Sequence, residues 1–111
     1  MSPTTSNTPR LGDLERAVME HLWASSAEHL DGATVREVLE RFDGQREIAY
    51  TTVMTVLDRL SKKSVVTRQL DGRAWLYTPT HTRVDLYELA IRDIMAELDD
   101  DDRTTLWERF R

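Results

Sequence analysis

Hydrophobic residues in the first half of the chain recur at helical spacing in two segments. The first spans residues 13–25, where the apolar positions fall within about half of a helical circumference. The second spans residues 35–42, where Thr34 and Glu37 have the spacing of a capping box at the start of a helix. We therefore expect two helices, with residues 29–33 available as a minor strand before the second.

A third helical segment, residues 50–63, separates its apolar and polar positions more sharply. Its apolar residues form one narrow arc, which predicts that this side packs against the first two helices. The arc consists of Val53, Val56, Leu57 and Leu60. The opposite side carries Thr51, Thr55, Asp58 and Lys62, flanked by Thr52, Met54 and Arg59. The sequence thus predicts a helix that is held on one side and presents polar groups on the other.

The segment after this helix alternates in the manner of two β-strands around a tight turn. Asp71-Gly72 is a dipeptide preferred in type I′ turns, and it predicts a hairpin over residues 65–78. The expected cross-strand pairs are Leu70–Arg73, Gln69–Ala74, Arg68–Trp75, Thr67–Leu76 and Val66–Tyr77. Because Arg68 then lies beside Trp75, a cation–π contact is expected between them.

Two further helices are predicted in the C-terminal third, over residues 83–98 and after the acidic run 99–102. The apolar arc of the first covers about 180°, so it needs something to cover it. The apolar residues of the two segments are Leu86, Tyr87, Ala90, Ile91, Ile94, Met95, Leu98, Leu106, Trp107 and Phe110. One interpretation is packing within the monomer. The interpretation we favour is a symmetric partner, which makes these residues dimerisation candidates in a homodimer.

Composition is that of an ordinary globular protein and excludes several kinds of site. Hydrophobic residues make up 40% of the 111 positions, and no apolar run approaches the roughly 18 residues of a membrane span. Cysteine is absent, which excludes disulfides, thiolate metal sites and a cysteine nucleophile. Residues 1–10 are rich in polar residues and lack the apolar core of a signal peptide. We expect a disordered arm there, and a cytoplasmic protein without membrane insertion.

The net charge of -5 is distributed unevenly. Most of the acidity follows residue 80, whereas positive charge gathers in and after the third helix. The cations of that region are Arg59, Lys62, Lys63, Arg68 and Arg73. The same region contains only one acid after Arg59, which is Asp71. A local patch of this kind attracts a polyanion even when the whole protein is acidic.

Three helices followed by a hairpin are typical of a winged helix-turn-helix domain. The predicted fold class is therefore mainly α with a small β-hairpin, completed by C-terminal dimerisation helices. A helix about 10–12 Å wide fits the major groove of B-DNA. Small hydroxyl side chains suit base edges, and the base-reading candidates are Thr51, Thr52, Thr55 and Met54. The five cations listed above are the candidates for phosphate contacts.

Several of these residues also have a purely structural interpretation. Asp58 counts against close approach of phosphate to the middle of the polar side, and it has the spacing to pair with Lys62. Met54 suits the edge of the core as well as a thymine contact. His81 and two acids that follow it have helical spacing suited to a metal, but such groups arise easily by chance. We predict no metal site and no cofactor.

Four stretches resemble the BlaI/MecI penicillinase-repressor family: “LGDLERAVMEHLW”, “ATVREVL”, “AYTTVMTVLDRLSKKSVV” and “DGRAWLYTP”. The resemblance covers about residues 11–80 and implies a dimeric winged-helix repressor. In such a protein residues 11–80 bind half of a palindromic operator in double-stranded DNA, and residues 81–111 dimerise. The resemblance places Thr51, Thr52, Thr55 and Lys62 on the DNA-facing side, and Arg68 and Arg73 on the wing. In several members a membrane sensor protease relieves repression by cleaving the dimerisation region.

The alternative to DNA binding is a winged-helix module that binds another protein through the C-terminal helices. An enzyme is not expected, because the sequence contains no nucleophile–base pair, no phosphate-binding glycine loop and no convincing metal cluster. The two remaining functions differ in one observable, which is the affinity of the isolated chain for DNA at low salt.

Overall fold

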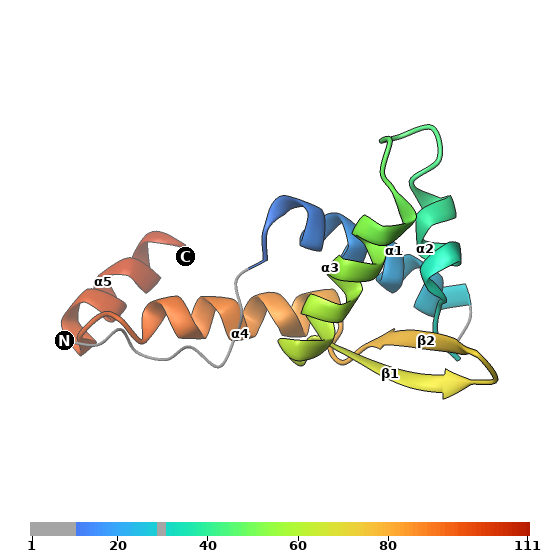
Figure 1. Cartoon of the computed structure of the whole chain (residues 1–111). Coiled ribbons are helices and arrows are strands. Elements are labelled where there is room, and N and C mark those ends of the chain that lie inside the picture. The colour runs from blue at the N-terminus through green and yellow to red at the C-terminus, as the bar shows by residue number, and fades with distance from the viewer. Residues whose placement is uncertain (1–10, 29–30) are drawn as a thin grey trace. The chain divides into compact units, whose positions relative to one another are not determined.

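The computed structural model describes residues 11–28 and 31–111, which fall into two compact units, 11–82 and 83–111 (Figure 1). The first unit contains α1 (Asp13–Glu28), α2 (Val35–Arg41), α3 (Tyr50–Lys62), β1 (Val66–Asp71) and β2 (Ala74–Pro79). The second contains α4 (Arg83–Met95) and α5 (Asp100–Arg109). Each predicted helix and strand of the first unit is present, in the order of a winged helix-turn-helix. The predicted arm, 1–10, lies outside the described residues.

The core of the first unit forms where α1, α2 and the base of the hairpin pack onto one side of α3. The predicted apolar arc of α3 is the side that is buried, and Val53, Leu57 and Leu60 have no exposed surface. Burying each such side chain stabilises the fold by about 1.5–3 kcal/mol. The other large contributions come from Val18, Met19 and Leu22 of α1, Val38 of α2, Val65 just before β1, Val66 of β1, and Tyr77 of β2.

The segment that leads into α2 is fixed by two sets of hydrogen bonds. The predicted capping box is present: Thr34 Oγ1 accepts from the Glu37 N–H at 3.1 Å, and Glu37 Oε1 accepts from the Thr34 N–H at 2.8 Å. Just before it, Ala33 and Tyr77 exchange backbone hydrogen bonds of 2.9 and 2.8 Å in an isolated bridge. Of the predicted minor strand, residues 29–30 lie outside the described residues, and Ala33 forms a single bridge that attaches the start of α2 to β2.

The hairpin forms where it was predicted, but its turn and register are different. The loop is Gly72-Arg73 and Asp71 faces Ala74, so each β1 residue pairs two positions further along β2 than expected. Gly72 has a φ of 63°, and among the described non-glycine residues only Ser64 has a positive φ. This is the pattern of a type II′ turn with glycine first. A type I′ turn over these two residues would instead impose a positive φ on Arg73, which is unfavourable for a long side chain.

Because the register moves by two residues, every side chain stays on its predicted face of the hairpin. Trp75 lies opposite Leu70 and Tyr77 lies opposite Arg68. The wrong turn type therefore changes which residues are direct neighbours, but it does not change which side of the wing they occupy.

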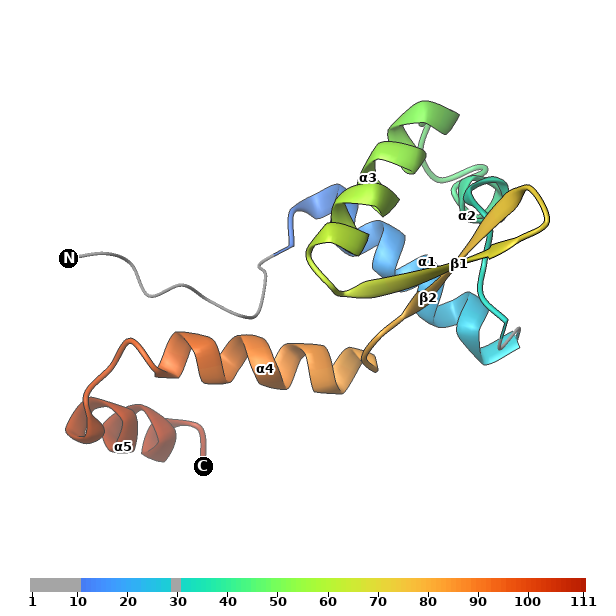
Figure 2. The ribbon, with the colours of Figure 1, turned by 60° about the horizontal axis from the view of Figure 1, so that its bottom comes forward.

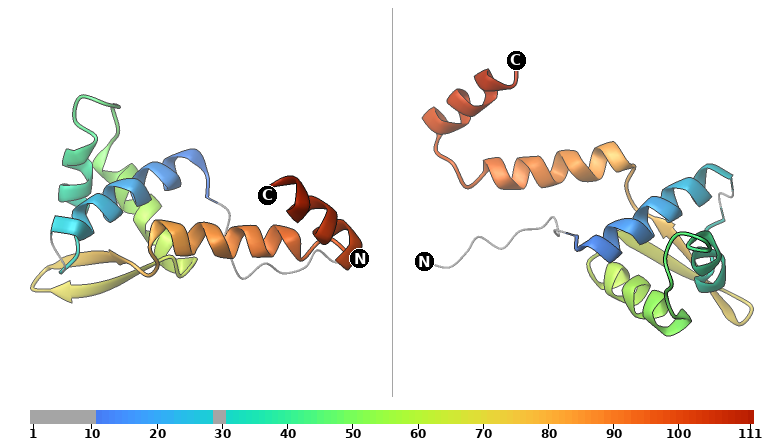
Figure 3. Two further views of the ribbon diagram at one scale, coloured as in Figure 1. Left: turned by 180° about the vertical axis from the view of Figure 1, so that it is seen from behind. Right: turned by 90° about the horizontal axis from the view of Figure 1, so that it is seen from above.

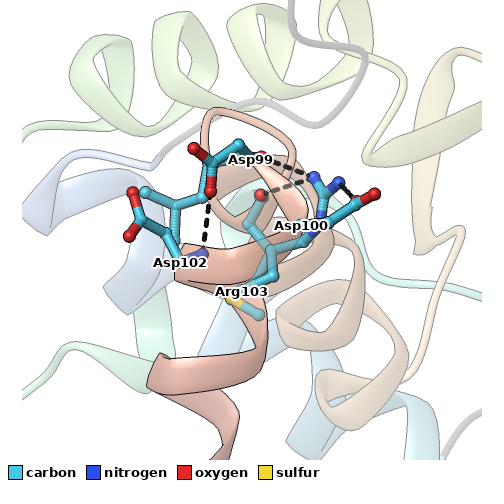
Figure 4. Close-up of polar contacts among 6 residues, drawn as sticks. Asp99, Asp100, Asp102 and Arg103 are labelled. Atoms are coloured by element: carbon cyan, nitrogen blue, oxygen red, sulfur yellow. Dashed lines mark hydrogen bonds and ion pairs between the residues drawn. The ribbon is translucent and has the colours of Figure 1, made fainter.

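In the second unit, the acidic run shapes the corner between α4 and α5, which form a bent pair (Figures 3 and 4). Asp99 caps α5 by accepting a 2.8 Å hydrogen bond from an N–H of its first turn. Arg103 pairs with Asp100 and donates from Nη1 to the carbonyl oxygens of Met95 at 3.2 Å and Leu98 at 2.7 Å. Here α4 ends three residues earlier than predicted, because the residues after Met95 form the corner.

A buried carboxylate joins the start of α1 to the end of α3. Both oxygens of Glu15 accept hydrogen bonds from Lys63 Nζ, at 2.9 and 2.8 Å, and Oε1 also accepts from the Gly12 N–H at 2.9 Å. Burial by itself would raise the pKa of Glu15. The hydrogen bonds from Lys63 and Gly12, together with the charges of Lys63 and Arg59, outweigh it, so the pKa lies below its ordinary value.

This pKa makes the stability of the fold depend on pH. Folded Glu15 binds its proton more weakly than unfolded Glu15, so the free energy of unfolding should fall as pH drops through about 4.3 towards the folded pKa. Glu15→Gln should remove this part of the pH dependence and lower the free energy of unfolding at pH 7 by about 1–3 kcal/mol. Urea unfolding followed by circular dichroism between pH 7 and pH 3 measures both.

The control for this experiment is Glu47→Gln, which removes an exposed carboxylate from the loop before α3. It should leave both the stability and its pH dependence close to those of the original chain. An unchanged pH dependence in Glu15→Gln would contradict the role given to the buried carboxylate.

Candidate nucleic-acid interface

The polar side of α3 is open to solvent. Thr51, Thr52 and Thr55 are all exposed, and Met54 is 43% exposed, so it belongs to this surface and not to the edge of the core. Figure 2 shows α3 lying across α1. The helix starts after Ala49 without a capping side chain. Its first backbone N–H groups therefore lack the partner that a capping side chain supplies.

A shallow depression of about 260 Å³ lies beside the threonines. Its lining combines hydroxyl groups, an apolar edge contributed by α1, and a cation. The lining residues are Leu14, Thr51, Thr52, Thr55, Val56 and Arg59. The exposed side of α3 thus offers hydrogen-bonding and apolar groups together, with positive charge at its margin.

Two of the predicted cations share one carboxylate. Oδ2 of Asp58 lies 3.2 Å from Lys62 Nζ, as the spacing along the helix predicted, and Oδ1 lies 3.9 Å from Nη1 of Arg68 on the wing. The guanidinium of Arg68 also lies over the Trp75 ring, 4.4 Å from its centroid. The predicted cation–π contact is therefore present, although it joins diagonal neighbours across the hairpin. Asp58 connects α3 to the wing through Arg68.

The three other predicted cations lie in different surroundings. Arg59 is exposed on α3, and Arg73 is exposed in the hairpin turn. Lys63 is held by the buried carboxylate of Glu15. Moving its ammonium to a phosphate would leave a buried negative charge without that partner, which is costly. We therefore assign Lys63 to the support of α3.

The contact between Arg36 and Tyr50 was not predicted from the sequence. Arg36 of α2 places its guanidinium 5.6 Å from the ring centroid of Tyr50, the first residue of α3. Both side chains are exposed, so they add a cation and an aromatic ring near the N-terminal end of α3. Because the contact joins two helices, no spacing within either helix could have revealed it.

In the second unit, half of the apolar residues predicted to dimerise are exposed. Tyr87, Ile91 and Ile94 of α4 are at least 40% exposed, and Trp107 and Phe110 of the C-terminal segment are 57% and 76% exposed. Ala90, Met95, Leu98 and Leu106 are half-buried. Leu86 differs, because it is only 4% exposed in the single chain and so adds nothing to the exposed set.

Two adjoining grooves run along these exposed residues. The larger has a volume of about 750 Å³, with Tyr87, Ile91, Met95 and Trp107 in its lining. The smaller has a volume of about 390 Å³ and an entirely apolar lining, formed by Ile91, Ile94, Met95, Leu106, Trp107 and Phe110. The larger groove is also lined by the charged residues Arg83, Glu88, Arg92 and Arg103. Since the grooves share Ile91, Met95 and Trp107, α4 and α5 present a continuous and largely apolar surface.

His81 and its neighbouring acids, which have helical spacing suited to a metal, do not form a metal site among the described residues. The backbone carbonyl oxygen of His81 accepts a 2.8 Å hydrogen bond from the Trp23 indole. Across residues 11–28 and 31–111, no three His, Cys, Asp or Glu side chains are grouped in a way that could hold a metal ion. In the same ranges no helix has the length and apolar character that crossing a membrane requires.

Comparison with known proteins matches residues 11–110 to the family model described as penicillinase repressor. The transcriptional regulator BlaI of Mycobacterium tuberculosis is 48% identical over 91 residues, which cover 82% of this chain and 63% of that protein. The penicillinase repressor of Bacillus licheniformis is 28% identical over 81 residues, which cover 73% of this chain and 59% of that protein. The matched part of this chain thus spans less than two thirds of the length of either relative.

A solved structure shows the same fold. The solution structure of the monomeric form of Bacillus licheniformis BlaI, in complex with the blaP half-operator, superimposes with a TM-score of 0.56 at 28% identity. The match covers 70% of this chain and 89% of that one. The winged-helix arrangement of α1 to β2 therefore agrees with that of a solved relative.

Proposed function

The chain belongs to the penicillinase repressor family, and on this basis we propose that it is a transcriptional repressor that binds double-stranded operator DNA through α3 and the hairpin. The observation that carries the proposal is the exposed side of α3, where three exposed threonine side chains are followed by Arg59 and Lys62, and where Arg68 of the wing reaches Asp58 of the same helix. The structure of Bacillus licheniformis BlaI with a half-operator supports the choice of ligand.

Base reading is proposed for the threonines. Thr51 and Thr55 are four residues apart and therefore lie on the same side of the helix. In the major groove each offers a hydroxyl to base edges and a methyl group to thymine. Thr52 and Met54 border them, so the same surface presents both polar and apolar contacts.

Phosphate binding is proposed for the cations around this surface. Arg59 and Lys62 extend from α3, while Arg68 and Arg73 extend from the wing. Arg36 adds a cation near the start of α3, where the first N–H groups of the helix also favour an anion. Contacts of this kind supply affinity and fix the register of the protein on the duplex, but they do not read sequence.

A homodimer on a palindromic operator is the proposed assembly. Residues 11–80 would bind one half-site, and the exposed apolar surface of α4 and α5 would pack against its symmetric copy. Two-fold symmetry then places the two copies of α3 one DNA turn, about 34–36 Å, or a multiple of it apart. Relief of repression by a membrane sensor protease stays a prediction, and a gene for such a protease beside the gene for this chain would support it.

DNA affinity should depend steeply on salt. Each phosphate contact contributes a slope of about −0.9 to the dependence of log affinity on log salt, so the five proposed cations give about −4.5 per chain. Fluorescence anisotropy with a duplex selected from a random library, over a series of salt concentrations, measures the slope. Binding that ignores salt would contradict the proposal. No binding at low salt would favour the protein-interaction alternative.

Two substitutions should separate base reading from phosphate binding. Thr55→Val keeps the shape but removes the hydroxyl, so it should change which duplexes are preferred, by about 1–3 kcal/mol at the base it contacts. Arg73→Met should weaken all duplexes alike and make the salt slope less steep by about 0.9. Arg41→Met is the control, because Arg41 pairs with Glu28 of α1. Equal effects of Thr55→Val on all sequences would argue against base reading.

The dimer surface can be tested with two matched substitutions on α4. Ile91 lines both grooves, whereas Leu89 is exposed but lines neither. Ile91→Glu should raise the dissociation constant of the dimer roughly 100-fold or more, because it removes two buried apolar side chains from a symmetric interface. Leu89→Glu should leave it nearly unchanged. Sedimentation equilibrium measures both, and a wild-type chain that stays monomeric at high concentration would refute the dimer.

A further inference from the structure

We propose that Asp58 acts as a selectivity residue, which holds one cation of α3 and one of the wing in place and lowers the affinity for DNA that offers only phosphate contacts. The inference rests on the proposed DNA-binding function and deepens it. It concerns an acid that lies where a DNA-binding surface would be expected to carry only neutral or positive side chains.

The position of Asp58 is central to the proposed interface. It follows Thr55 by one helical turn on the polar side of α3, and its two oxygens are used by different elements. One oxygen lies 3.2 Å from Lys62 Nζ on the same helix, and the other lies 3.9 Å from Arg68 Nη1 on β1. Arg68 is held from a second side by the Trp75 ring. The carboxylate therefore sets the distance between the helix and the wing cations.

The bridge is weak enough for DNA to compete with it. The side chains of Lys62 and Asp58 are 78% and 43% exposed, and ion pairs between exposed groups are screened by water and salt. An incoming phosphate can therefore attract Lys62 and Arg68 away from Asp58. The carboxylate then remains close to the phosphates, and its negative charge opposes binding.

The negative charge of Asp58 should affect non-specific binding and the binding of a recognised duplex differently. Binding without sequence recognition consists almost entirely of phosphate contacts, so it benefits most from mobile cations and loses most from a fixed negative charge. A recognised duplex is also held by base contacts, which fix the register of α3 in the groove. Affinity for a recognised duplex therefore depends less on the phosphate contacts that Asp58 opposes. Asp58 should therefore weaken non-specific binding more than specific binding.

The test compares three variants of the full chain on two duplexes. One duplex is selected from a random library by the original protein, and the other is a scrambled sequence of the same composition. Asp58→Asn should raise affinity for the scrambled duplex about fivefold, the factor expected for an exposed ion pair at the top of its usual range, and for the selected duplex less than twofold. Its salt slope on scrambled DNA should steepen, by up to about 0.9 for each freed cation. Asp58→Glu, which keeps the charge, should restore most of the discrimination.

Asp71→Asn is the matched control. Asp71 is an exposed acid at the end of β1, and its replacement changes the net charge as much as the replacement of Asp58 does. It should raise affinity for both duplexes by the same factor. If Asp58→Asn does the same, Asp58 acts only through net charge and the inference falls, while the proposed function stands. If the original chain binds neither duplex, the proposed function fails and the inference fails with it. Fluorescence anisotropy at several salt concentrations distinguishes these outcomes.

Discussion

The packing of the apolar side of α3 against the core is the constraint on which the other features of the first unit depend. Its apolar and polar residues lie on opposite sides of one helix, so burial of Val53, Leu57 and Leu60 leaves the threonine side exposed. The buried Glu15–Lys63 pair then holds the end of α3 against the start of α1. A helix that is fixed in both rotation and position can present short side chains accurately, and threonine side chains are too short to compensate for a poorly placed backbone.

The parts of the fold that were predictable are those that arise within one element. Helical spacing located all the helices, and the capping box at Thr34 and Glu37 formed as expected. The cation–π contact between Arg68 and Trp75 was also predictable, because the alternation of side chains on a strand survives a register error of two residues. The register itself was not, since it depended on whether glycine took the first or the second position of the turn.

Specific polar contacts between elements, other than the two strands of the hairpin, could not be predicted from the sequence. The pairing of Glu15 with Lys63, the contact of Arg36 with Tyr50 and the reach of Asp58 to the wing all join residues whose separation along the chain carries no periodic signal. These contacts change the candidate site. On their basis we reassign Lys63 to the support of α3 and add Arg36 to the proposed interface. Asp58, which counted against DNA binding, contacts two of the proposed cations.

The bridge between Ala33 and Tyr77 closes the segment from α2 through α3 to β2, which contains the proposed DNA-binding surface, into a loop. Everything from the start of α2 through α3 and β1 is enclosed between two residues that are hydrogen-bonded to each other. Gly32 sits at this junction with a φ of 104°, and a Cβ there would lie 2.8 Å from Thr78 Oγ1, so the closure tolerates no larger residue at that position. A change in chain length between the two bridged residues must be accommodated within the segment that they enclose. A longer or shorter loop before α3 should therefore leave the two bridged residues, Ala33 and Tyr77, in place.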